Sequence, residues 1–173
     1  MLKYLVVLLY LFSGCKSQSI DSYKKEPKYV HLADEIIKVT SEELREKKNL
    51  ILIGTGGSLM HEVKKISMSY LYPGSFNIAE TRDLVIFASQ LFLKNININE
   101  EIKPYLIHDP FQINDIKIFI STQNEKSPIR AVTLSSEKLI FYISDKEEVL
   151  KKIHEETYEE ALKIVENEKS SKK

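Results

Sequence analysis

Three of the four histidines in this chain are followed directly by a carboxylate, and these pairs come nearest to catalytic or metal chemistry. They are His61 with Glu62, His108 with Asp109, and His154 with Glu155. Imidazole titrates near neutrality and acts as a general base when a carboxylate orients it. Neighbouring residues of a strand point to opposite faces, however, so an adjacent pair in an extended segment does not form one site. An enzyme would need His61 or His108 to meet a carboxylate from elsewhere in the fold.

The sequence motifs of zinc proteases, phosphate-binding loops and serine hydrolases are incomplete or missing. The run from His154 begins like the helix of a zinc protease, but Tyr158 occupies the position of the second histidine ligand. The glycine cluster at residues 54–57 lacks the lysine and hydroxyl residue of a phosphate-binding loop, so we interpret it as a turn or bulge. No Gly-x-Ser-x-Gly sequence occurs. The sequence therefore predicts no metal site, no cofactor and no assembled catalytic group.

Cys15 is the only cysteine, and it follows a short apolar stretch. Lys3 gives a positive start, residues 5–12 are apolar, and Ser13 and Gly14 are small, which is the layout of a secretory signal peptide. The apolar stretch is well short of the ~20 residues that a membrane-spanning helix needs. We therefore predict that residues 1–14 are a signal peptide and that the protein leaves the cytoplasm.

Residues 11–15 resemble the lipobox of bacterial lipoproteins, although Phe12 stands where a small aliphatic residue is usual. The resemblance implies cleavage before Cys15 and acylation of that cysteine. Because stable anchoring takes more than one acyl chain, the diacylglycerol and third chain would hold the protein on a membrane. Lys16, in place of aspartate, resembles lipoproteins sent to the outer membrane, with the inner membrane as the alternative.

The composition limits the partners and the chemistry. The 173-residue chain carries 25 basic and 25 acidic side chains, so it has no basic excess to favour nucleic acid, and we predict no nucleic-acid partner. Acylation of Cys15 would leave no thiol, which excludes disulfides, thiolate metal sites and cysteine nucleophiles. The fold must be held together by packing.

The chain divides into a short tether and one domain. We expect residues 15–28 to hold the lipidated cysteine and a polar, flexible tether, residues 29–168 to form a single domain, and residues 169–173 to form a disordered tail. Apolar periodicity predicts helices over residues 31–47, 77–95 and 145–166, and strands over 50–53, 63–72, 113–121, 130–134 and 138–144. Because strands and helices do not alternate regularly, we expect an α+β fold: an antiparallel sheet of about five strands with about three helices mainly on one face.

Two helix starts carry capping-box signatures. Asn77 is followed three residues later by Glu80, and Ser144 by Glu147. These pairs predict the beginnings of the central and final helices.

Residues 96–110 form a connection stiffened by Pro104 and Pro110, and Tyr105 and His108 within it are candidate binding residues. This connection resembles segments of uncharacterised bacterial lipoproteins, a likeness that implies no activity. We expect a lipid-anchored envelope protein that acts as a binding or structural module, with an envelope protein as a candidate partner. The alternatives are an envelope hydrolase or small-ligand enzyme using His61 or His108, and a protein that offers its sheet edge to a partner strand.

Overall fold

The computed structural model describes residues 25–144 and 149–171 and has an α+β fold, as the sequence predicts. Six strands form one sheet in the order β1-β2-β3-β4-β5-β6. The β2–β3 pair is parallel and the other four pairs are antiparallel. The strands are β1 (Ile51–Ser58), β2 (Lys65–Leu71), β3 (Ile116–Ser121), β4 (Ala131–Ser135), β5 (Lys138–Ser144) and β6 (Leu150–Thr157). The helices are α3 (Lys28–Lys48), α4 (Ile78–Asn97) and α5 (Tyr158–Ser170), with short 3-10 turns η2 (Lys103–Tyr105) and η3 (Ile113–Asp115).

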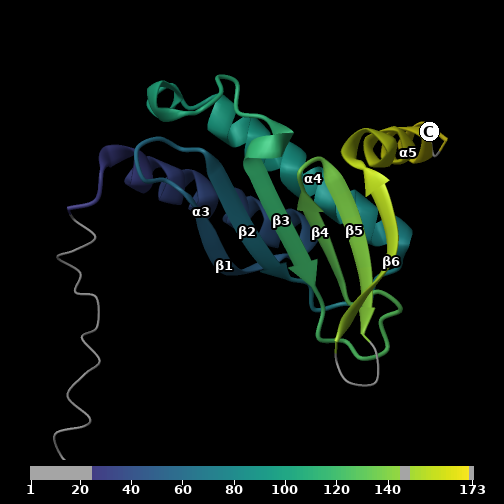
Figure 1. Ribbon diagram of the computed structural model, residues 1–173. Coiled ribbons are helices and arrows are strands. Elements are labelled where there is room, and N and C mark those ends of the chain that lie inside the picture. Colours follow the sequence, from purple (N-terminus) through teal and green to yellow (C-terminus); the bar gives the residue numbers. More distant parts are fainter. Residues whose placement is uncertain (1–24, 145–148, 172–173) are drawn as a thin grey trace, which may run out of the picture.

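The single parallel pair arises because α4 connects β2 to β3 across one face of the sheet (Figure 1). A parallel neighbour needs such a crossover, whereas the other adjacent strands are joined by hairpins or short connections. Helix α4 begins at the predicted capping box, in which the Asn77 side chain accepts from the Glu80 N–H and the Glu80 carboxylate accepts from the Asn77 N–H, each at 3.0 Å. The predicted central helix is therefore confirmed.

The first helix is also confirmed, and α3 begins at Lys28, inside the segment predicted as tether. Its apolar stripe is buried, and Leu44 is fully buried near its end. Asn49 stops the helix in a left-handed conformation (φ 54°), which asparagine tolerates better than most residues. Leu50 then turns into the core and β1 begins.

The glycine cluster is not a turn, because it lies inside β1. Gly54, Gly56 and Gly57 all pair with residues of β2, and the register shifts between Leu52 and Gly54. A bulge is therefore present, but the strand continues through the glycines to Ser58. The predicted strand over residues 50–53 was too short because glycine disfavours strands, and pairing with β2 overrides that preference.

The predicted final helix is wrong over its first half. Residues Leu150–Thr157 form β6, which pairs with β5, and α5 begins only at Tyr158. Its cap is Thr157, whose side chain accepts from the N–H of Glu160 at 3.2 Å. Ser144 ends β5, and Glu147 lies outside the described residues. The apolar spacing fits a helix, but the open edge of β5 gains a full set of ladder hydrogen bonds from the sixth strand.

Two other boundaries differ from the sequence prediction. Residues Ile113–Asp115 form a 3-10 turn rather than the start of β3, because Asp115 accepts from the backbone N–H of Gln112. Helix α5 runs to Ser170, two residues into the segment predicted as a disordered tail. The predicted hairpin of β4 and β5 is confirmed, with Ser136 and Glu137 both at positive φ as a two-residue turn of the type I′ class requires.

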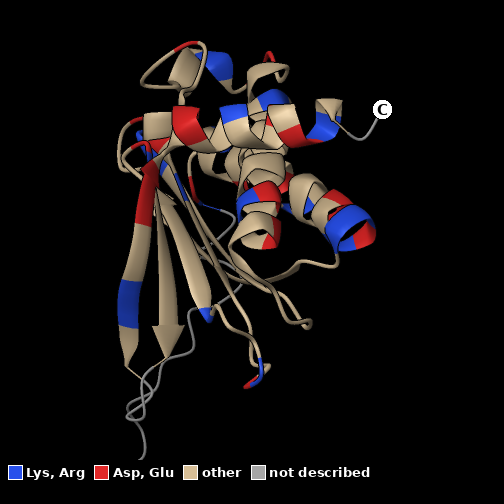
Figure 2. Cartoon of the chain, turned by 90° about the vertical axis from the view of Figure 1, so that its right-hand side faces the viewer, with Lys and Arg blue, Asp and Glu red and all other residues tan. Residues whose placement is uncertain are grey.

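The hydrophobic core lies between the sheet and the three helices, which gather on one side of the strands (Figure 2). Tyr70, Phe92 and Phe141 are among its largest fully buried side chains. The Tyr70 hydroxyl lies 3.1 Å from the Ser41 hydroxyl, and burial raises the pKa of Tyr70 to about 12. The opposite face of the sheet carries no helix in the described part of the chain.

Candidate functional site

The helix-free face of the sheet forms a shallow trough of about 410 Å³, which we call the open-face trough. It crosses five strands and combines hydroxyls, one ammonium group and apolar surface. Its lining side chains on this face are Ser67 and Ser69, Lys117 and Phe119, Thr133, Tyr142 and Leu150. A concave surface that mixes aromatic, hydroxyl and charged groups is typical of a binding site.

Strand register aligns these side chains. Ser69 pairs with Phe119, and Phe119 pairs with Thr133, so the three lie in one row across β2, β3 and β4. Lys117 pairs with Ser67 in the neighbouring row. Since side chains alternate between the two faces of a strand, the residues between them point into the core. The two-residue period of the sequence thus positions the trough.

Glycines of β1 lie next to the trough at the edge of the sheet. Gly54 and Gly56 pair with Ser69 and Ser67, so this part of the face has almost no side chains. A Cβ at Gly56 would meet nothing within 4 Å, whereas at Gly57 it would overlap the carbonyl oxygen of Lys65. Only Gly57 is therefore required by close packing. Sequence reasoning missed this surface because it interpreted the glycines as a turn or bulge rather than as paired residues of a strand.

His108 meets a carboxylate, but not the adjacent Asp109. Its Nδ1 lies 2.9 and 3.0 Å from the two oxygens of Asp115, a residue that is 5% exposed. Asp115 Oδ2 also accepts from the N–H of Gln112 at 2.8 Å. The buried carboxylate orients the ring, and the His108 side chain remains 47% exposed. A carboxylate that hydrogen-bonds a histidine ring in this way is found in general bases and also in structural contacts within loops.

Tyr105 lies in the same connection as His108 and contacts other partners. Its ring lies 5.4 Å from that of Tyr29, and its carbonyl oxygen accepts from the N–H of Val63 at 2.7 Å. His61 is exposed in the β1–β2 connection, and its neighbour Glu62 pairs with Lys64 at 3.3 Å. The predicted candidates therefore have different partners although Val63 hydrogen-bonds their two segments together, and Cys15 lies outside the described residues.

A cluster that the sequence did not suggest joins α4 to β6. The guanidinium of Arg82 donates to both carboxylate oxygens of Glu156, at 2.6 and 2.9 Å, and both residues are buried. His154 Nε2 lies 3.1 Å from the same carboxylate and its ring lies 5.4 Å from that of Phe141. The 74 residues between Arg82 and Glu156 leave no local signal for such a pair.

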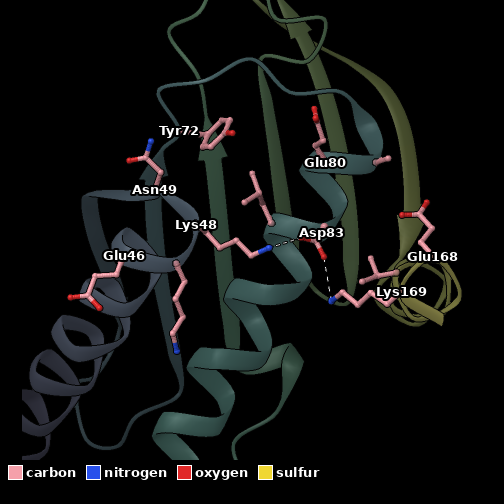
Figure 3. A pocket seen from close by; sticks show the side chains of 12 residues that line it. Glu46, Lys48, Asn49, Tyr72, Glu80, Asp83, Glu168 and Lys169 are labelled. Carbon is pink, nitrogen blue, oxygen red and sulfur yellow. Dashed lines mark hydrogen bonds and ion pairs between the residues drawn. The ribbon is translucent and has the colours of Figure 1, made fainter. Parts of the chain in front are cut away.

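A second cleft, about 630 Å³, lies between the end of α3, the start of α4 and the end of α5 (Figure 3). Asp83 points between two lysines and accepts from Lys48 Nζ at 2.8 Å and pairs with Lys169 Nζ at 3.3 Å. Burial opposes ionisation of Asp83, but hydrogen bonds and charge from the two lysines hold its pKa below the usual 3.8. This arrangement is a closed ion-pair network that links three helices.

Among the described residues, no group of three or more histidine, cysteine, aspartate or glutamate side chains is arranged to hold a metal ion. In the same part of the chain, none of the helices combines the length and apolar character needed to cross a membrane. No protein-family model matches the chain, and neither the curated proteins nor the solved structures compared with it give a significant match. The function must therefore be argued from this chain alone.

Proposed function

We propose that this protein is a lipid-anchored lipoprotein of the bacterial envelope that acts as a binding module, with the open-face trough contacting an envelope protein. The observation that carries the proposal is the contrast between a fully packed helix face and an uncovered concave face on the same sheet. The anchor rests on the sequence of residues 1–16.

The side chains of the trough favour recognition of another protein over catalysis. Phe119 and Tyr142 offer aromatic area at low entropic cost, and Tyr142 adds a hydroxyl. Lys117 and the row of serines supply hydrogen-bond donors around them. Aromatic anchors surrounded by small polar groups are typical of the centre and rim of an interface.

The anchor is tested first by intact mass and membrane fractionation of the wild type and of Cys15→Ala. We expect the wild type to lack residues 1–14, to carry acyl chains and to sediment with membranes, with the outer membrane enriched over the inner. We expect Cys15→Ala to lose the acyl mass and the membrane association. A wild-type chain that is unmodified and soluble would overturn the proposal.

The binding face is tested by a photo-crosslinking residue placed at Phe119 in living cells. Phe87 on the helix side, half-buried like Phe119, provides the matched control position. We expect one adduct of defined mass at position 119 and none at position 87. Equal labelling at both positions, or none at 119, would contradict binding through the open face.

A second candidate function is favoured by the His108–Asp115 contact, since it supplies the distant carboxylate that an enzyme using His108 would need. This would be an envelope hydrolase or a small-ligand enzyme. The test compares His108→Gln with His61→Ala in a strain lacking the gene. Loss of complementation only with His108→Gln would support the enzyme, and full complementation by both variants would rule it out.

A further inference from the structure

Connecting segments at the end of the domain where α3 begins carry exposed apolar side chains. Met60, between β1 and β2, is 81% exposed, and Ile107, in the connection after α4, is 38% exposed. In Figure 1 the start of α3, the β1–β2 connection and the connection after α4 all lie at this end. We call Met60 and Ile107, with the aromatic pair Tyr29 and Tyr105 between them, the tether-end patch.

Backbone and side-chain contacts hold the patch together. The Tyr29 hydroxyl donates to the carbonyl oxygen of Met60 at 3.0 Å, and its ring packs 5.4 Å from that of Tyr105. Val63 donates to the Tyr105 carbonyl at 2.7 Å and accepts from the Ile107 N–H at 3.1 Å. The exposed side chains are therefore presented on a fixed base that joins three segments far apart in the sequence.

Three ion pairs lie on the segments that carry the patch. Lys28 pairs with Glu101 at 2.6 Å, Lys64 with Glu62 at 3.3 Å, and Lys103 with Glu100 at 2.7 Å. The charges of these six side chains cancel, so they add no net attraction to an anionic lipid surface. Tyr105 is partly exposed, and tyrosine is a residue type enriched where proteins meet the membrane interface, whereas Tyr29 is buried and supports the patch from beneath.

The chain itself indicates what covers this end. Only residues 16–27 separate Cys15 from Lys28, the first residue of α3. An extended residue spans at most ~3.6 Å, so a lipid on Cys15 keeps the start of α3 within ~50 Å of the bilayer. At that range the effective concentration of the bilayer at the patch is high. Apolar side chains can then bind the bilayer with an affinity that would be too weak for an untethered protein.

We propose that the tether-end patch lies against the lipid bilayer, with Met60 and Ile107 inserted into its interfacial region; this inference rests on the proposed anchor at Cys15. The strands then stand with their β1–β2 connection at the membrane. The open-face trough points sideways, accessible to a partner in the same envelope compartment.

The chain has no tryptophan, so a single introduced tryptophan reports from one site. The experiment places Met60→Trp, and separately Ile153→Trp, in the full lipidated chain on phosphatidylcholine vesicles with brominated acyl chains. Ile153 is 44% exposed on β6, at the opposite edge of the sheet. We expect Met60→Trp to lose most of its emission and shift to shorter wavelength, and Ile153→Trp to keep the emission it has on unbrominated vesicles.

The outcomes separate the orientation from the anchor. An acylated, vesicle-bound chain in which both variants are equally quenched, or in which neither is, overturns the orientation alone. A chain without acyl mass overturns the anchor and the orientation with it. Ile107→Trp gives a second reading of the same patch, and quenching there but not in Ile153→Trp supports the proposal if Met60→Trp folds poorly.

Discussion

The two faces of the sheet are built from the same strands, but one is buried against the helices and the other is open. On the helix-covered face Ile66, Met68 and Tyr70 alternate along β2 with at most 1% of their surface exposed. On the open face the intervening Ser67 and Ser69 are half-buried and small. The helix-covered face therefore supplies the stability of the fold, and packing does not fix which residues occupy the open face.

The largest expected difference between the faces is at two neighbours on β5. Phe141→Ala removes a fully buried ring and is expected to lower the free energy of unfolding by about 3 to 5 kcal/mol. Tyr142→Ala, on the open face, is expected to cost about 1 kcal/mol or less. Urea denaturation of both variants measures the difference. Equal losses would show that the open face is covered in the folded protein.

A second comparison uses two neighbours on β6 that form ion pairs on opposite faces. Arg82→Ala leaves the Glu156 carboxylate buried with only His154 beside it, and we expect a loss of about 3 kcal/mol. Lys138→Ala breaks the exposed pair with Glu155, and we expect no measurable loss at moderate salt. Thermal and urea unfolding check both. Recovery in the double variant Arg82→Met with Glu156→Leu would confirm that the loss comes from an unpaired charge.

The adjacent glycines of β1 extend the comparison to the backbone. A methyl group at Gly57 overlaps the Lys65 carbonyl oxygen and lies 3.1 Å from Leu59 Cδ1, so Gly57→Ala is expected to cost about 2 kcal/mol. Gly56→Ala enters open space and is expected to change stability by less than about 0.5 kcal/mol. Chemical denaturation distinguishes the two. A large loss of stability in Gly56→Ala would mean that another group occupies the space beside Gly56.

Local patterns predicted the parts of the fold that depend on local physics. The two-residue period of β2 and the capping box of Asn77 and Glu80 are both present in the structure because burial on one face and satisfaction of free N–H groups act over a few residues. The α+β class follows from the same elements. The parallel β2–β3 pair could not be predicted, since it depends on how α4 crosses the sheet.

The features that the sequence did not predict depend on contacts that local patterns do not show. The apolar residues Leu150, Ile153 and Ala161 fit helical spacing, and only the free edge of β5 decides that the first two lie in a strand. His108 was a predicted candidate, but its partner is Asp115 rather than the adjacent Asp109, because a 3-10 turn brings Asp115 back to it. Packing of Tyr105 on Tyr29 links residues 76 positions apart and leaves no sequence signal.

The smallest expected effect concerns a carboxylate on the open face. Hydrogen bonds from Lys138 and Lys152, reinforced by their charges, lower the pKa of Glu155 from 4.5 to about 2. A pKa lower in the folded than in the unfolded chain stabilises the fold above pH 4.5, and this contribution is lost as the pH falls toward 2. Glu155→Gln should therefore be slightly less stable than the wild type at neutral pH and equal to it near pH 2.

Salt distinguishes this exposed pair from the buried one. The Debye length falls from ~30 Å at 0.01 M to ~3 Å at 1 M ionic strength, so salt screens exposed charges more strongly. The difference in stability between Glu155→Gln and the wild type at neutral pH should therefore shrink over that range. The loss caused by Arg82→Ala should persist, because Glu156 is buried and its carboxylate is screened much less by salt. Urea denaturation at both ionic strengths measures each difference. If the stability difference between Glu155→Gln and the wild type does not change with salt, a covering segment excludes solvent from the open face. The open face would then not be exposed at β6.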